Sequence, residues 1–171
     1  MKIVLYIATS LDGYIAGADD DMSWLDAFAE SGTDYGYDEF YQSVDALVMG
    51  RRTYDWIVEN SEWPYDKPAW VMTHRRLDNA PETVQTSDIP VSMLCETLDA
   101  QGYEQVWLVG GGQLVKRFLQ AGRIDEFCMF IMPVLLGDGI PLFPSGFDLH
   151  RLNLRVSQSH VGGVMELRYE K

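Results

Sequence analysis

The chain has 171 residues, enough for one domain with a full hydrophobic core but short for two independent domains. Its 26 acidic residues outnumber 13 basic ones, and the formal net charge of −13 disfavours a nucleic-acid partner, because such partners need a basic face. No apolar run approaches the ~20 residues of a membrane span, so no membrane partner is expected. Two cysteines without metal-site spacing are expected to be free thiols. We therefore expect one cytoplasmic domain over residues 1–171.

Apolar runs alternate with helical patterns through most of the chain. Runs that are apolar at nearly every position are typical of strands covered on both faces, and strand–helix alternation implies right-handed crossovers in a largely parallel sheet. The expected strands are 3–8, 46–49, 68–72 and 105–109, and the expected helices are 23–28, 37–44, 52–58, 93–101 and 113–121.

After Asp125 the hydrophobic period changes. Residues 127–134 predict a long strand, and residues 152–158 and 164–170 alternate around Gly162 and Gly163. That pair predicts an antiparallel hairpin at one edge of the sheet. Residues 9–22 and 135–148 are rich in turn-forming residues and are expected to be connections. The predicted fold is α/β, with a mostly parallel central sheet, flanking helices and an antiparallel C-terminal hairpin.

The end of the second expected strand carries a concentration of basic groups. The apolar run stops at Gly50, and Arg51, Arg52 and Thr53 begin the next helix. Unpaired N–H groups and the helix dipole make this end partly positive, and guanidinium groups add charge, so the segment is suited to phosphate. The alternative is surface pairing with the abundant carboxylates, which would contribute little. The position at a strand end favours phosphate.

Two other strand ends carry comparable signals. One continues into Thr73, His74, Arg75 and Arg76, and the other into a run of three glycines, 110–112. The carboxyl ends of parallel strands meet at one edge of a sheet, where ligands bind. The arginine pair is suited to the 2′-phosphate that separates NADP from NAD. The glycines allow backbone to approach a pyrophosphate, although a plain turn explains them equally well and the Rossmann spacing is absent.

Four motifs occur in an order that is recognisable. They are residues 7–16, 48–54, 109–114 and 133–143, and their succession resembles the dihydrofolate-reductase-like superfamily. Within it, the chain is most similar to the reductase domain at the C-terminus of the bifunctional riboflavin-biosynthesis deaminase-reductase. The resemblance spans residues 2–170 and implies a dihydrofolate-reductase-like three-layer fold.

The resemblance also implies roles for single residues around an NADPH cofactor. Ala8 and Ile15 would border the nicotinamide, while the loop at 9–22 would close over it. Cofactor phosphates and the 2′-phosphate would be held by separate strand ends. The implied phosphate residues are Gly50, Arg51, Arg52 and Thr53; the implied 2′-phosphate residues are Thr73, His74 and Arg75; the implied pyrophosphate turn is Gly110, Gly111 and Gly112.

Catalytic and substrate residues are less sharply indicated. Dihydrofolate reductases place a carboxylate on the helix before the second strand; counting back from Gly50 reaches Asp34, and a register one turn different offers Asp38. Either carboxylate would also suit a helix N-terminus for dipole reasons alone. Stacking surface for a substrate is offered by Trp24, Tyr37 and Tyr41, for which core packing is the alternative.

The chain departs from its relatives in two respects. It has no His-x-Glu paired with Cys-x-x-Cys, so the zinc deaminase half is absent, and no pattern for a folate glutamate clamp is evident. We expect an NADPH-dependent reductase of a small heterocyclic metabolite, pteridine- or 5-amino-6-(5-phosphoribosylamino)uracil-like. The alternatives are dihydrofolate reductase proper and a non-catalytic NADPH-binding sensor module.

We expect a homodimer through the apolar connection 133–144. We assign no metal, since Asp138 between glycines is typical of a tight turn.

Overall fold

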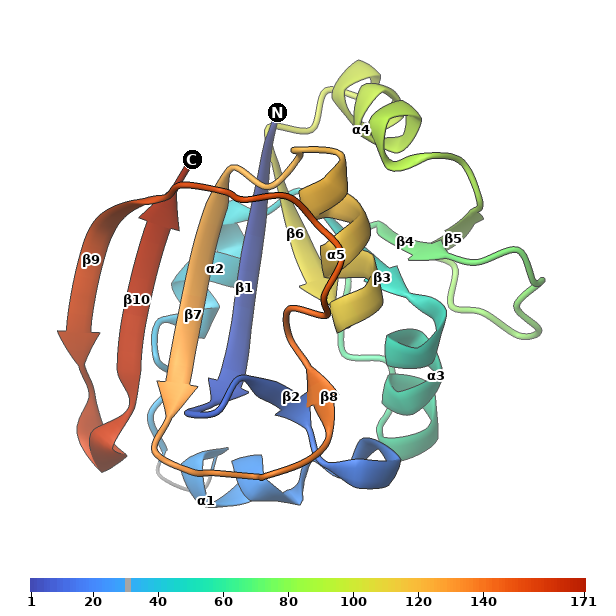
Figure 1. The fold of residues 1–171 in the computed structure, drawn as a ribbon. Coiled ribbons are helices and arrows are strands. Elements are labelled where there is room, and N and C mark those ends of the chain that lie inside the picture. Colours follow the sequence, from blue (N-terminus) through green and yellow to red (C-terminus); the bar gives the residue numbers. More distant parts are fainter. Residues whose placement is uncertain (30–31) are drawn as a thin grey trace.

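A single sheet with helices on both faces forms the centre of the molecule (Figure 1). The computed structural model describes residues 1–29 and 32–171. The strands of the main sheet are β1 (Lys2–Ser10), β3 (Ala46–Gly50), β4 (Ala69–Met72), β5 (Val84–Ser87), β6 (Gln105–Gly110), β7 (Glu126–Met132), β9 (Asn153–Ser159) and β10 (Met165–Glu170). Their spatial order is β5-β4-β3-β6-β1-β7-β10-β9; neighbours are parallel as far as β7, and β10 and β9 are antiparallel. The predicted parallel sheet with an antiparallel hairpin at its edge is confirmed.

Helices cover the two faces of this sheet in two separate layers. They are α1 (Asp26–Ala29), α2 (Tyr37–Ser43), α3 (Arg51–Asn60), α4 (Val91–Ala100) and α5 (Gly112–Gln120), with 3-10 turns η1 (Ala18–Asp20), η2 (Ser23–Leu25) and η3 (Val161–Gly163). Leu94 of α4 and Phe118 of α5 pack into one core, while Phe40 of α2 and Ile57 of α3 pack into the other. Figure 1 shows α5 in front of the sheet and α2 behind it. No helix in the described part of the chain is long and apolar enough to cross a membrane.

The central strands are apolar at nearly every position because both of their faces are covered. In β1, Leu5 faces the core under α4 and α5, whereas Tyr6 faces the core under α1, α2 and α3. Successive side chains of a strand point to opposite faces, so a strand buried on both sides has no polar alternation. This pattern is what made these strands predictable.

The two segments expected to be plain connections pair with each other. Strand β2 (Tyr14–Ala16) and strand β8 (Ile140–Pro141) form a small antiparallel sheet. Asp12 joins them further, because its carboxylate accepts hydrogen bonds from the backbone N–H of Leu136 at 3.1 Å and of Gly137 at 2.8 Å. Strands this short carry no readable alternation, so the pairing could not be predicted from the sequence. The segment at 9–22 is therefore fastened to the segment that follows β7.

One carboxylate is buried within the C-terminal hairpin. Glu166 of β10 is 4% exposed; it accepts a hydrogen bond from the Arg168 guanidinium, and its Oε2 lies 2.7 Å from His160 Nε2. Burial alone would raise the pKa of Glu166, but the hydrogen bonds from Arg168 and His160 outweigh it and hold the pKa below its ordinary value. A carboxyl group with a lowered pKa in the folded state stabilises the fold above its unfolded pKa, and this contribution is lost as pH falls towards the folded pKa.

Replacing this buried carboxylate should destabilise the fold at neutral pH. Glu166→Gln leaves the Arg168 and His160 side chains without their charged acceptor, at an expected cost of about 1–3 kcal/mol in the free energy of unfolding. The variant should also lose less stability than wild type as pH falls below about 4.3. Urea unfolding at pH 7 and through the acid range measures both.

Glu170→Gln is the matched control for this variant. Glu170 lies on the same strand and pairs with Arg155 at 2.7 Å, but its side chain is 38% exposed and that of Arg155 is 60% exposed, so its loss should cost less than about 1 kcal/mol. Equal losses in the two variants would contradict the assigned role of Glu166.

Candidate functional site

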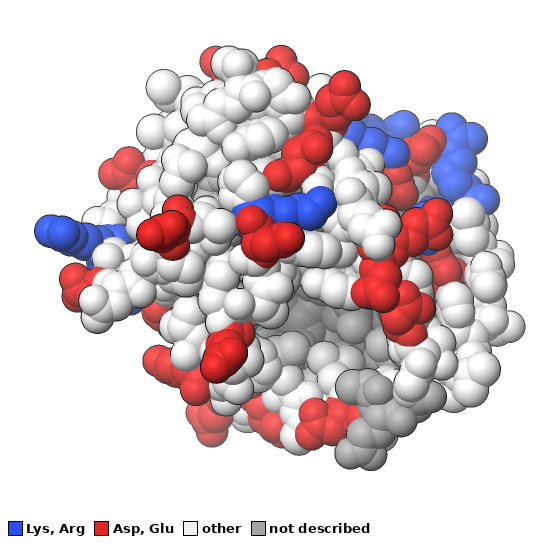
Figure 2. Space-filling view, turned by 180° about the vertical axis from the view of Figure 1, so that it is seen from behind, with Lys and Arg blue, Asp and Glu red and all other residues white. Residues whose placement is uncertain are grey.

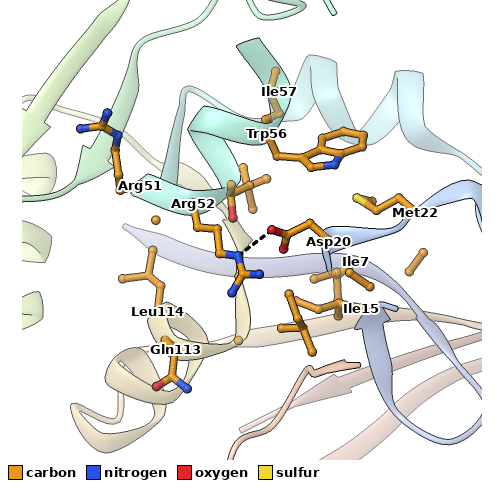
Figure 3. Close-up of a pocket in the computed structure, with 18 of the residues that line it drawn as sticks. Ile7, Ile15, Asp20, Met22, Arg51, Arg52, Trp56, Ile57, Gln113 and Leu114 are labelled. Carbon is orange, nitrogen blue, oxygen red and sulfur yellow. Dashed lines mark hydrogen bonds and ion pairs between the residues drawn. The ribbon is translucent and has the colours of Figure 1, made fainter. Parts of the chain in front are cut away.

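A cavity of about 560 Å³ opens at the carboxyl edge of the parallel strands. The ends of β1, β3, β4 and β6 contribute to its wall, together with the first turns of α3 and α5 and the segment from Ile15 to Leu25. This is the place where open parallel sheets bind ligands, and the volume lies within the ordinary range for ligand sites. Figure 3 shows part of its lining.

Two helix N-termini meet at this cavity. Helix α3 follows Gly50 and helix α5 follows Gly111, and neither glycine supplies a side-chain cap. A Cβ placed on Gly50 would lie 3.7 Å from the Gly110 carbonyl oxygen, and one on Gly111 would lie 3.5 Å from Thr53 Oγ1. The uncapped N–H groups and positive dipole ends of both helices therefore face one small region, which is suited to a phosphate or pyrophosphate.

The two arginines at the start of α3 point in different directions. Arg51 pairs with Asp55 at 2.6 Å, and its Nη1 lies 3.5 Å from the carbonyl oxygen of Arg76, in the loop after β4. Arg52 points into the cavity and pairs with Asp20 at 2.8 Å (Figure 3). The structure thus brings the four predicted phosphate residues, Gly50 to Thr53, into the cavity wall. It also shows that both guanidinium groups already have carboxylate partners.

The predicted 2′-phosphate loop lies beside the cavity rather than in its wall. Met72, the last residue of β4, lines the cavity, and Thr73, His74 and Arg75 follow it. Thr73 Oγ1 accepts a hydrogen bond from the Arg75 backbone N–H at 3.0 Å, and His74 lies 3.5 Å from Asp88 with both side chains exposed. The contact from Arg51 to the Arg76 carbonyl joins this loop to the start of α3.

The predicted nicotinamide residues occupy the apolar part of the wall. Ala8 and Ile15 both line the cavity, and Ile15 Cδ1 lies 3.6 Å from a Cβ placed on Gly111. Gly112 also lines it, whereas Gly110 is set back from it with a φ of 118°. Eight of the twelve predicted cofactor residues therefore line a single cavity: Ala8, Ile15, Gly50, Arg51, Arg52, Thr53, Gly111 and Gly112.

Two of the predicted substrate aromatics, Tyr37 and Tyr41, pack against aromatic residues that line the cavity. Tyr37 stacks on Tyr41 with centroids 5.8 Å apart and meets the edge of Trp107 at the same distance. Burial raises the pKa of Tyr37 to about 12, so its phenol stays neutral. Neither tyrosine is among the residues that line the cavity, nor is Trp24. Substrate contact by Trp24, Tyr37 and Tyr41 therefore stays a prediction.

Other aromatic residues form the wall itself. They are Tyr6, Trp56, Tyr65 and Trp107. Trp56 stands four residues after Arg52 in α3, and that helical spacing was a readable sign that the two share a face. Tyr65 lies in a loop that carries no periodic pattern. Burial raises the pKa of Tyr65 well above its ordinary range, so its hydroxyl keeps its proton.

The predicted catalytic carboxylate is not among the residues that line the cavity. Asp34 is exposed and accepts hydrogen bonds from the backbone N–H groups of Gly36 at 3.1 Å and Asp38 at 3.3 Å, at the start of α2. Asp38 is exposed as well. Among the described residues that line the cavity, Asp20 supplies the carboxylate, and sequence reasoning assigned it no role. A catalytic role for Asp34 stays a prediction.

Within the described ranges, no group of three or more His, Cys, Asp or Glu side chains is placed to hold a metal ion. Asp138 instead accepts a hydrogen bond from the backbone N–H of Gly139 at 2.7 Å, within the loop that leads to β8.

With this geometry in view, comparison with known proteins decides the family. Residues 1–164 match the model of the RibD C-terminal domain. The chain belongs to the RibD C-terminal domain family. It is also 38% identical over 170 residues to YwjB, an uncharacterized protein of Bacillus subtilis, covering 98% of this chain and 97% of that one.

Solved structures share the fold over the whole chain. A putative riboflavin biosynthesis protein from Shewanella sp. PV-4 is 30% identical and superposes with a TM-score of 0.90, covering 99% of this chain and 98% of that one. A pyrimidine reductase-like protein from Corynebacterium diphtheriae is 17% identical with a TM-score of 0.73, covering 99% and 91%. The second likeness shows the fold alone. The resemblance inferred from the sequence motifs is confirmed.

Adding a methyl group at the start of α5 should strain the site. A Cβ on Gly112 would lie 2.2 Å from the Pro141 carbonyl oxygen, which is backbone and has no rotamer to change. We expect Gly112→Ala to lower the free energy of unfolding by about 1–3 kcal/mol, as overpacking does. Urea unfolding followed by tryptophan fluorescence measures the change.

Gln113→Ala is the matched control, because residue 113 lies in the same helical turn but is exposed. Its effect should stay within about 0.5 kcal/mol. If Gly112→Ala were no more damaging than the control, the close approach would not constrain the site.

Proposed function

We propose that this chain is an NADPH-dependent reductase that transfers hydride to a small heterocyclic metabolite. The observation that carries the proposal is the meeting of the uncapped N-termini of α3 and α5 beside an apolar cavity at the end of β1. Paired helix N-termini suit a pyrophosphate, and an adjoining apolar surface suits a nicotinamide ring. The glycines between the helices leave room for such a group, so the residues present fit the cofactor.

The relatives support this proposal at the level of chemistry. The family is named after RibD, and the Corynebacterium diphtheriae structure is described as pyrimidine reductase-like. A Thermotoga maritima structure with a TM-score of 0.73 and 15% identity is described as a deaminase and 5-amino-6-(5-phosphoribosylamino)uracil reductase; this chain covers 56% of it. The zinc-deaminase motif does not occur in this sequence, so a reductase activity alone is proposed for it. Free thiols at the buried Cys95 and Cys128 support a cytoplasmic setting.

In this reaction, bound NADPH would supply the hydride. The work of the chain is to bind, orient and exclude water. Ala8 and Ile15 would set the face of the nicotinamide, and the hydrogen bonds from Leu136 and Gly137 to Asp12 would hold the 9–22 segment in place over it. Tyr65 lies in the wall, and burial keeps its phenol protonated. Its hydroxyl would therefore serve as a hydrogen-bond donor for the substrate. Asp34 stays the proposed proton donor, although it is not among the residues that line the cavity.

One observation favours a second candidate, a non-catalytic NADPH-binding sensor. The carboxylate expected to protonate the substrate is instead bonded to backbone N–H groups at the start of α2. NADPH binding without turnover of any pteridine or ribosylaminopyrimidine would favour the sensor. Turnover of dihydrofolate would favour dihydrofolate reductase proper.

Titration with NADPH and NADH tests the proposal. Arg51 reaches the 73–76 loop, so a 2′-phosphate held there would gain a charged hydrogen bond worth about 1.5–3 kcal/mol. We expect wild type to prefer NADPH, and Arg51→Ala to weaken NADPH binding by about that amount while affecting NADH much less. Nicotinamide fluorescence measures both affinities.

Arg155→Ala is the control, because Arg155 also pairs with a carboxylate but lies on β9, which contributes no residue to the cavity wall. It should leave both affinities unchanged. Binding of neither nucleotide by wild type would end the reductase proposal.

We also propose a homodimer through the connection after β7. Leu135 is 71% exposed and Phe143 is 39% exposed, which leaves apolar surface for a second copy to cover. Leu142, expected in the same contact, is instead 1% exposed because it packs into the monomer core.

Sedimentation tests the dimer. We expect twice the 19.4 kDa chain mass at micromolar concentration, and Leu135→Asp should shift the mass towards that of one chain. A wild-type mass of one chain under the same conditions would contradict the dimer.

A further inference from the structure

The cavity has an aromatic half and a charged half. The aromatic half lies on the face of the sheet that α1, α2 and α3 cover. Besides Ala8 and Val109, the cavity-lining residues on this face are Tyr6, Leu25, Trp56, Ile57, Tyr65 and Trp107. We call these six residues the aromatic wall. In Figure 3, Trp56 and Ile57 lie at one end of the drawn cavity, Gln113 and Leu114 lie at the other, and Arg52 and Asp20 lie between.

The charged half holds all the cationic side chains that line the described cavity. They are Arg51 and Arg52 in the first turn of α3, and Arg117 in α5 on the opposite face of the sheet. Arg51 already pairs with Asp55, and Arg52 pairs with Asp20. If the cofactor phosphates bind at the helix N-termini, Arg51 and Arg52 in the first turn of α3 serve the cofactor. Arg117 stands in the last turn of α5, on the opposite face of the sheet from the aromatic wall. Then no cation is left for a second anionic ligand among the lining residues on the face of the sheet that carries the aromatic wall.

Negative charge also surrounds the cavity. The Asp20 carboxylate lies inside it, and acidic side chains stand around the hollow in the face shown in Figure 2. A phosphate monoester placed against the aromatic wall would lose its water and find no guanidinium to replace it, which is costly.

The aromatic wall can bind a planar ring by stacking and hydrogen bonding, although it has no cation to pair with an anion. Trp56 presents a half-buried indole, and stacking on such a ring adds about 0.5–1.5 kcal/mol beyond the area buried. Tyr65 adds one hydroxyl that can bond to a polar ring edge. A neutral heteroaromatic ring can therefore be bound here without an unpaired charge.

We propose that the aromatic wall binds a neutral, planar heteroaromatic substrate that carries neither a phosphate nor a carboxylate tail. The inference rests on the proposed function, because it assigns the arginines to the cofactor. The inferred substrate therefore differs from the phosphoribosyl compound in the description of the Thermotoga maritima protein, which carries a phosphate. The inferred substrate also differs from dihydrofolate, whose glutamate tail is anionic.

Matched ligand pairs that differ only in the phosphate test this inference. The probes are 5-amino-6-(5-phosphoribosylamino)uracil with its dephosphorylated nucleoside, and FMN with riboflavin, titrated by calorimetry with saturating NADP⁺, which cannot deliver a hydride. We expect the uncharged member of at least one pair to bind about tenfold or more tightly than its phosphate, equivalent to about 1.4 kcal/mol. A phosphorylated member that binds equally or more tightly in both pairs, or binding of no member of either pair, would overturn the inference.

A gain of charge sharpens the test. Leu25 belongs to the aromatic wall and is only half-buried, so a longer side chain is tolerable there. Leu25→Arg should raise the affinity for the phosphorylated member about tenfold, within the range for a charged hydrogen bond, while Leu25→Gln, polar but uncharged, should not. Equal behaviour of the two variants, once both are folded by circular dichroism, would mean that a missing cation is not what excludes the phosphate.

A failure of the proposed function can be distinguished from a failure of this inference. Absence of NADP⁺ or NADPH binding would end the cofactor assignment, and the same ligand pairs titrated against the protein alone would still decide which ring the aromatic wall accepts.

Discussion

Two helices begin where neighbouring parallel strands end, and a glycine precedes each of them. Strands β3 and β6 are adjacent, so α3 and α5 start side by side, with Gly50 and Gly111 in near contact. Any side chain at Gly112 would meet the Pro141 carbonyl oxygen. The positive ends of both helices are thereby held at one place without a capping side chain, and every proposal for this site depends on that arrangement.

The segments that complete the cavity are fixed by contacts between distant parts of the sequence. Asp12 ties the segment after β1 to the segment after β7, and β2 pairs with β8 beside it. Hydrogen bonds from Ser10 and from the Gly137 backbone hold the pKa of Asp12 below its ordinary value, so it stays a charged acceptor in all but acid conditions. Asp20, at the end of the same segment with a φ of 61°, reaches Arg52 across the cavity.

The fold and the grouping of strand-end residues at one cavity could be predicted from the sequence. Buried parallel strands are continuous apolar runs, and their carboxyl ends converge by topology, so the residues at 50–53 and 110–112 can be grouped by sequence reasoning alone. The aromatic wall of the cavity could not be predicted in this way. Helical spacing identified the apolar face of the helix at 37–44, but the same spacing fits a residue that touches a ligand and one that packs a layer deeper. Tyr37 and Tyr41 pack against aromatic residues that line the cavity, whereas Trp56 and Trp107 form the wall.

The position of a bound cofactor tests the central claim most directly. A crystal structure of the chain with NADP⁺ should place the pyrophosphate oxygens within hydrogen-bond distance of backbone N–H groups in the first turns of both α3 and α5. The nicotinamide should lie against Ala8 and Ile15. A pyrophosphate bound at only one helix, or away from both, would contradict the claim that the two N-termini together form the phosphate site.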